Sequence, residues 1–162
     1  MLPKKANFFT IREEQSEKSD FQQQGVLRKS REVRQASVTL FEVMDILNAR
    51  LLVGRKFLNT EVKTAFSADL LSDVLAYARP GSVLLTGLTN PQVVRTASVL
   101  DIAAIILVRG KIPPAETLRL GEELDVPIMA THYILFESSG RLYSRGMVGC
   151  IQKVGSDEIV SL

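Results

Sequence analysis

The sequence predicts an α/β domain: a parallel, or mostly parallel, sheet with helices on both faces. Short aliphatic runs at 83–85, 103–108 and 126–130 are typical of strands buried on both sides. Each run is followed by a segment whose apolar residues recur every three or four positions, as in an amphipathic helix. Such alternation is the pattern of βαβ units. With 162 residues, 46% of them apolar, the chain can bury one core, which favours a single domain.

The elements before this alternation have their own signals. Thr39 and Glu42 have the spacing of a capping box, so we expect a short helix from Leu40 to about Leu47. A brief apolar run at 51–53 ends at a glycine. The later elements are expected as a strand at 62–66, a helix at 70–78, a strand at 83–85, a helix starting near Pro91, a strand at 103–108, a helix at 115–124, a strand at 126–130 and a helix at 132–144.

Residue types at the helix starts support these boundaries. Pro91 suits the first helical position, because the N–H that proline lacks has no intrahelical partner there. Ser67, Asn90 and Thr131 have the short polar side chains of helix caps. Asp69 is expected to complement the N-terminal dipole of the helix that it precedes.

Both ends of the chain are expected to lie outside this core. Residues 1–36 hold eight Lys/Arg and five Asp/Glu, with few apolar residues, which predicts a mobile charged arm. The α/β domain would then span residues 37–146, and residues 147–162 would form a C-terminal extension. In that extension, 148–154 and 158–160 flank a turn, so they form either an edge hairpin or strands that lie on a neighbouring subunit.

Composition narrows the class of protein. A lone cysteine, Cys150, excludes an intramolecular disulfide, and no apolar run of about 18 residues is present, so we expect a cytoplasmic protein without a signal peptide or membrane span. The basic cluster at 28–34 could contact nucleic acid. Because acidic residues accompany it and aromatic residues do not, a solvated arm is the favoured interpretation.

Polar residues follow the predicted strands, and the strand-to-helix loops of a parallel sheet meet at one edge. Small hydroxyls, helix starts, two cations and the single histidine would therefore gather there. Such a rim suits an anionic group such as a phosphate, although the same residues also serve as ordinary helix caps and loop charges. The candidate ligand-binding residues are Ser67, Asp69, Thr86, Gly87, Thr89, Asn90, Arg109, Gly110, Lys111, Thr131 and His132.

Catalytic and cofactor motifs are missing from the sequence. No third group is identifiable that would orient His132 or Cys150 for a nucleophilic relay. Asp69 and Asp73 lie one helical turn apart without further acids, which is typical of helix charges and not of a metal site. The chain has neither the Gly-Lys-Ser/Thr ending of a P-loop nor a G-x-G-x-x-G motif. We therefore expect no catalysis, no metal and no cofactor.

Several stretches resemble a known family. They are Phe66-Ser-Ala-Asp-Leu-Leu-Ser-Asp-Val74, Leu85-Thr-Gly87, Ile105-Ile-Leu-Val-Arg-Gly110, Pro127-Ile-Met-Ala-Thr131 and Phe136-Glu-Ser-Ser-Gly-Arg-Leu-Tyr143. Over about residues 40–145 the sequence looks like a DRTGG domain, a module that is similar to the N-terminal domain of HPr kinase/phosphorylase. It departs from the family pattern at Leu88-Thr89-Asn90, where an Asp-Arg-Thr-like turn is expected, and at Arg109-Gly110, which replaces a Gly-Gly pair.

The resemblance implies a non-catalytic regulatory or dimerisation module, because in larger proteins with this domain the chemistry lies elsewhere. We therefore expect a homodimer that acts through contact with a partner protein and is gated by a small anionic ligand. The alternative is a sensor that binds a nucleotide or phosphorylated metabolite at the carboxyl edge of the sheet.

Overall fold

A six-stranded sheet is the centre of the computed structural model, which describes residues 37–155; these belong to one compact unit. Its order is β2-β7-β6-β5-β4-β8, and β1 and β3 form a separate pair. The strands are β1 (Val38–Thr39), β2 (Arg50–Val53), β3 (Glu61–Val62), β4 (Thr64–Ser67), β5 (Val83–Thr86), β6 (Ala104–Leu107), β7 (Ile128–Ala130) and β8 (Val148–Gly149). The helices are α2 (Leu40–Ile46), the 3₁₀ turn η1 (Arg55–Phe57), α3 (Leu71–Tyr77), α4 (Pro91–Val99), α5 (Ala115–Glu123) and α6 (Leu135–Ser144).

The main sheet is mostly parallel, as predicted. Strands β4, β5, β6 and β7 lie side by side in chain order and pair in parallel, and β8 pairs in parallel with β4. Only β2 runs antiparallel, with Arg50 opposite Ala130 of β7. Every residue of β5 and β6 is buried, which explains why these strands are continuous apolar runs in the sequence.

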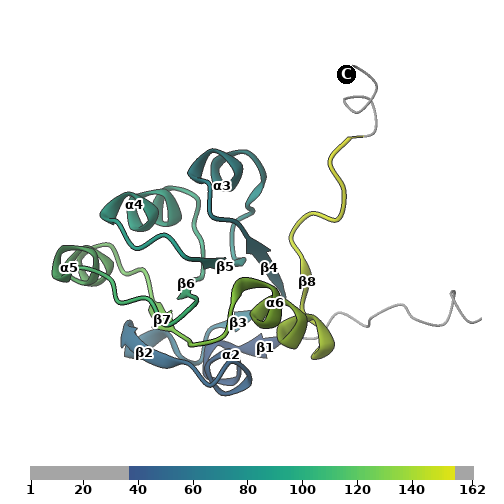
Figure 1. Cartoon of the computed structure of the whole chain (residues 1–162), viewed down its shortest axis with the longest axis horizontal. Coiled ribbons are helices and arrows are strands. Elements are labelled where there is room, and N and C mark those ends of the chain that lie inside the picture. The colour runs from purple at the N-terminus through teal and green to yellow at the C-terminus, as the bar shows by residue number, and fades with distance from the viewer. Residues whose placement is uncertain (1–36, 156–162) are drawn as a thin grey trace, which may run out of the picture. The chain divides into compact units, whose positions relative to one another are not determined.

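Helices cover both faces of the sheet. Figure 1 shows α3, α4 and α5 over one face and α2 and α6 over the other. Alternate residues of β6 reach the two faces: Ile105 packs with the core under α3, α4 and α5, and Ile106 packs with the core under α2 and α6. The predicted α/β architecture is therefore confirmed.

The connections leave β6 and β7 in opposite directions. The chain passes from β6 to α5 on one face, whereas from β7 it passes to α6 on the other face (Figure 1). Adjacent parallel strands whose connections diverge in this way leave a crevice at their carboxyl ends, and ligands of open α/β sheets bind in such crevices. The geometry therefore singles out the ends of β6 and β7.

Some predicted helix caps are confirmed and others are wrong. Thr39 and Glu42 form the capping box of α2, and the Asn90 side chain accepts a hydrogen bond from the Val93 N–H at the start of α4. Thr131 does not cap a helix, because α6 begins at Leu135 and the Thr131 hydroxyl instead donates to the Leu47 carbonyl at 2.7 Å.

The start of α3 also differs from the prediction. This helix begins at Leu71, with Leu70 as an N-cap that has no side-chain acceptor. Ser67 lies four residues before Leu71 at the end of β4, so it cannot cap α3. The Asp69 carboxylate accepts hydrogen bonds from the Gly87 N–H and from the Arg109 guanidinium, on the loops after β5 and β6.

The C-terminal extension is only partly described. β8 pairs with β4 through Thr64 and Ala65, at the edge of the main sheet. The predicted arm at 1–36, with its basic cluster, and the strand at 158–160 lie outside the described residues, so the arm, the hairpin and the domain boundaries remain predictions. None of the helices within residues 37–155 is both long and apolar enough to cross a membrane.

Candidate functional site

The Asp69 carboxylate connects three loops at the carboxyl edge of the sheet. It accepts hydrogen bonds from the Gly87 N–H at 2.5 Å and from the Thr86 hydroxyl at 3.3 Å. Its second oxygen forms an ion pair with the Arg109 guanidinium, with 2.7 Å between Oδ2 and Nη2. The loops after β4, β5 and β6 are thus held together by one side chain.

These contacts favour the charged form of Asp69. Burial raises the pKa of this carboxyl, but the Gly87 amide, the Arg109 guanidinium and the Thr86 hydroxyl lower it, and the net effect is a lowered pKa. Asp69 therefore neutralises Arg109 and occupies the amide and guanidinium donors that an anionic ligand would otherwise use. We refer to Asp69, Thr86, Gly87 and Arg109 as the Asp69 cluster.

The backbone after β6 brings Arg109 into this cluster. Arg109 and Gly110 both have positive φ, of 67° and 64°, and the Arg109 N–H donates to the Tyr133 carbonyl at 2.8 Å. The guanidinium passes so close to Gly87 that a Cβ there would overlap it. Lys111 adds a further link, because its ammonium donates to the Gly87 carbonyl at 2.8 Å.

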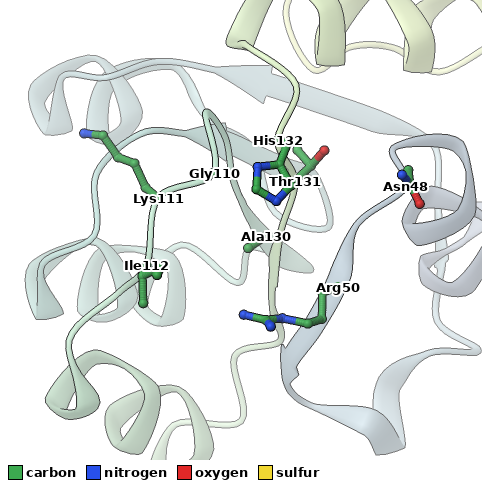
Figure 2. Close-up of a pocket in the computed structure, with 8 residues that line it drawn as sticks. All are labelled: Asn48, Arg50, Gly110, Lys111, Ile112, Ala130, Thr131 and His132. Carbon is green, nitrogen blue, oxygen red and sulfur yellow. The ribbon is translucent and has the colours of Figure 1, made fainter.

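A pocket of about 300 Å³ lies beside the cluster, in the crevice between the ends of β6 and β7. Its walls come from the loop after β6, the loop after β7 and the start of β2 (Figure 2). The lining residues are Asn48, Arg50, Gly110, Lys111, Ile112, Ala130, Thr131 and His132.

The lining of this pocket carries positive charge and no carboxylate. Figure 2 shows the Arg50 side chain extending across the pocket towards the Ile112 side, whereas the Lys111 side chain turns away towards the loop after β5. Arg50 is exposed and forms no salt bridge with the described residues. The His132 ring lies against Gly110, where a Cβ would come within 2.7 Å of Nδ1.

Eight of the eleven predicted rim residues are thus divided between two places. The Asp69 cluster contains Asp69, Thr86, Gly87 and Arg109. The pocket contains Gly110, Lys111, Thr131 and His132, and Lys111 contacts both places.

The three other predicted residues form hydrogen bonds within the chain. The Ser67 hydroxyl lies 2.8 Å from the Ser139 hydroxyl of α6. The Thr89 carbonyl accepts from the Thr117 hydroxyl at 2.8 Å, and Asn90 caps α4. Their role in ligand binding, like that of the whole predicted set, remains a prediction.

The sequence interpretation did not include four residues of the pocket: Asn48, Arg50, Ile112 and Ala130. Ile112 and Ala130 directly adjoin predicted residues, so a wider window around each loop would have included them. Asn48 and Arg50 are different, because they reach the pocket through the antiparallel pairing of β2 with β7. No local pattern indicates a pairing between segments that are about 80 residues apart.

The described part of the chain does not offer a metal site, since no group of three or more His, Cys, Asp or Glu residues within 37–155 could hold an ion. Cys150 donates a weak hydrogen bond to the Tyr77 carbonyl. His132 lies at the other end of the sheet order, beside β7, so these two side chains do not form a pair.

Comparison with known proteins agrees with the fold. The chain is similar to the crystal structure of the CBS and DRTGG domains of the regulatory region of Clostridium perfringens pyrophosphatase, complexed with its activator diadenosine tetraphosphate. The TM-score is 0.54 at 16% sequence identity, and the match covers 76% of this chain and 53% of that chain. This chain therefore spans about half the length of that regulatory region.

No curated protein matched the sequence closely enough to count as a relative. Similarity to the N-terminal domain of HPr kinase/phosphorylase remains a prediction. The family model described as "DRTGG domain" matches residues 42–144, which is well over half of the chain. The chain therefore belongs to the DRTGG domain family, as its motifs predicted.

Proposed function

We propose that this protein is a ligand-sensing regulatory domain that binds a small anionic molecule, such as a nucleotide or a phosphorylated metabolite. The observation that carries the proposal is the pocket between the ends of β6 and β7, which lies where connections diverge and whose lining contains Arg50 and no carboxylate. Of the two functions that the sequence predicts, the geometry thus favours the sensor.

The pocket combines an anion-binding group with apolar walls. The Arg50 guanidinium offers a planar fork of donors that matches phosphate or carboxylate oxygens. The Ile112 and Ala130 side chains offer apolar surface, while Asn48 and His132 add polar atoms that can orient a ligand. A volume of about 300 Å³ lies at the lower end of the usual range for ligand pockets, so we expect a molecule of mononucleotide size.

A ligand in this pocket would act on the neighbouring Asp69 cluster. Lys111 belongs to the pocket lining, and its ammonium holds the Gly87 carbonyl. Gly87 in turn donates its N–H to Asp69, which binds Arg109. A ligand that attracts the Lys111 ammonium would loosen this chain of contacts, which provides a physical route from the pocket to the loops after β4 and β5.

The regulatory part of the proposal draws on the family and on the neighbour in fold, a regulatory region crystallised with a nucleotide activator. We propose that this chain performs no catalysis, works in the cytoplasm as a homodimer, and passes on its ligand state through contact with a partner protein.

A thermal-shift panel tests the sensor. We expect millimolar AMP, ATP or inorganic phosphate to raise the melting temperature of the full chain, since a ligand that binds only the folded state stabilises it by mass action. Arg50→Gln should weaken the binding at least tenfold in isothermal titration calorimetry, because the anion loses its guanidinium.

Arg95→Gln is the matched control, since Arg95 is an exposed arginine on α4 that does not line the pocket. It should bind as the wild type does. If no probe in the panel changes the melting temperature, the sensor hypothesis is wrong. If Arg50→Gln and the wild type bind with equal affinity, the ligand lies elsewhere.

A further inference from the structure

We propose that the outward side of α6 is the surface through which two copies of this chain associate. Three residues form this surface, which we call the α6 face: Phe136, Gly140 and Tyr143. The two aromatic side chains are 84% and 54% exposed. Ser138 and Leu142, on the opposite side of the helix, are fully buried and attach α6 to the sheet.

The packing of a single copy does not explain why the α6 face has exposed aromatic side chains and a glycine. Phe136 is among the most exposed large apolar side chains within residues 37–155. Glycine is one of the least favourable residues inside a helix, and Gly140 lies in the middle of α6. A Cβ at this position would meet no heavy atom of the described residues within 4 Å. Gly140 therefore leaves open space on the helix surface, where it borders a hollow that Ile46, Glu137 and Arg141 also line.

The spacing of these residues favours a second copy of the same helix as the occupant. Phe136 lies four residues before Gly140, and Tyr143 lies three residues after it. When two such helices cross in antiparallel orientation at Gly140, Phe136 of each copy comes opposite Tyr143 of the other. The missing Cβ at the crossing point lets the backbones approach closely, and the two aromatic pairs cover the crossing from both sides.

Charge supports the same arrangement. Glu137 and Arg141 lie on one flank of the α6 face, and they form an ion pair within the chain at 2.7 Å. In a two-fold antiparallel pair, this flank meets the same flank of the second copy, so Glu137 lies near Arg141 of the other chain. Both side chains are partly exposed and can therefore form cross-chain ion pairs. A surface whose charges complement themselves is expected of an isologous dimer.

This inference rests on the homodimer proposed above and is independent of the ligand pocket. The dimer is tested by size-exclusion chromatography with light scattering on the full 17.9 kDa chain. The protein is measured at roughly 5–100 μM, the range in which pairs of micromolar affinity are dimeric. We expect the wild type at twice the chain mass and Phe136→Asp at the mass of one chain. Val99→Asp is the matched control, because Val99 is a 78% exposed apolar residue on α4, and it should remain dimeric.

Gly140→Ala should stabilise the monomer and weaken the dimer. Alanine favours the helix, so it should raise the melting temperature of dilute, monomeric protein. In the dimer its methyl group separates the two backbones, so the dissociation constant should rise at least tenfold. Circular dichroism of each variant should show unchanged helix content.

Two outcomes would overturn the proposal in different ways. A wild type that is monomeric at 100 μM overturns both the homodimer and the α6 face. A dimeric wild type whose Phe136→Asp variant dimerises equally well leaves the homodimer in place and overturns the α6 face alone. Neither outcome depends on whether a probe binds at Arg50.

Discussion

Replacing Asp69 should separate the loops after β4, β5 and β6. Asp69→Ala removes the acceptor for the Gly87 N–H at 2.5 Å, for Arg109 at 2.7 Å and for Thr86 at 3.3 Å. Hydrogen bonds to charged groups contribute about 1.5–3 kcal/mol when shielded, but exposed ion pairs contribute only about 0–1 kcal/mol. The Asp69 side chain is 38% exposed, so we use the lower end of both ranges. For the three contacts together, we expect the free energy of unfolding to fall by about 2 kcal/mol.

Urea unfolding followed by circular dichroism measures this loss. For a domain of this size, about 2 kcal/mol corresponds to a fall of roughly 8 °C in melting temperature. Asp69→Asn keeps one oxygen for the Gly87 N–H, but it loses the charge, and an NH2 donor replaces the oxygen that accepts from Arg109. We expect it to lower the free energy of unfolding by about 1 kcal/mol. Asp73→Ala is the control: Asp73 lies in the first turn of α3, and its removal should cost less than about 0.5 kcal/mol.

The effect should depend on pH with a defined sign. The pKa of Asp69 is lowered in the folded protein, so its contribution is complete above the unfolded pKa of about 3.9 and is lost as the pH falls through the folded pKa. The stability difference between wild type and Asp69→Asn should therefore shrink between pH 5 and about pH 2.5. An equal difference at both pH values, or an Asp69→Ala variant as stable as the wild type at pH 7, would refute the reasoning.

Two further predictions concern the core. Gly54→Ala should lower the free energy of unfolding by about 3 kcal/mol or more, because Gly54 has a φ of 93° and a Cβ would come within 2.7 Å of the Pro127 Cα. An unchanged urea midpoint would contradict this close packing. Ser138→Ala should stabilise the protein by up to about 1 kcal/mol, because the Ser138 hydroxyl is fully buried without a hydrogen-bond partner among the described residues. A fall in melting temperature would show that the hydroxyl does form a hydrogen bond.

Features that depend on neighbouring residues were predicted well. The capping box at Thr39 and Glu42 and the cap at Asn90 are present, and the aliphatic run at 103–108 contains β6. These signals are local, because a cap satisfies amides within its own first turn and an apolar run reports burial of its own strand. Thr131 shows the limit of such reasoning. It has the residue type of a helix cap, but its hydroxyl donates a hydrogen bond to the carbonyl of Leu47, which is distant in the sequence.

The candidate site was predicted only in part for the same reason. The sequence indicated which loops reach the carboxyl edge of the sheet, and the structure confirms that edge. It did not indicate that Asp69 would bind Gly87 and Arg109, or that the remaining loops would enclose a separate pocket. Contacts between loops depend on which strands are neighbours, and the strand order is not encoded in any one segment.

By itself, the sequence determined the α/β class, most helix and strand positions and membership of the DRTGG family, because hydrophobic period, caps and motifs are written within short stretches of chain. Only the tertiary structure decided the antiparallel pairing of β2 with β7, which brings Arg50 to the pocket, and the exit of α5 and α6 to opposite faces, which opens the crevice. These features arise from the packing of segments that are far apart in the chain, where the burial of the whole core, and not the preference of any segment, selects the arrangement.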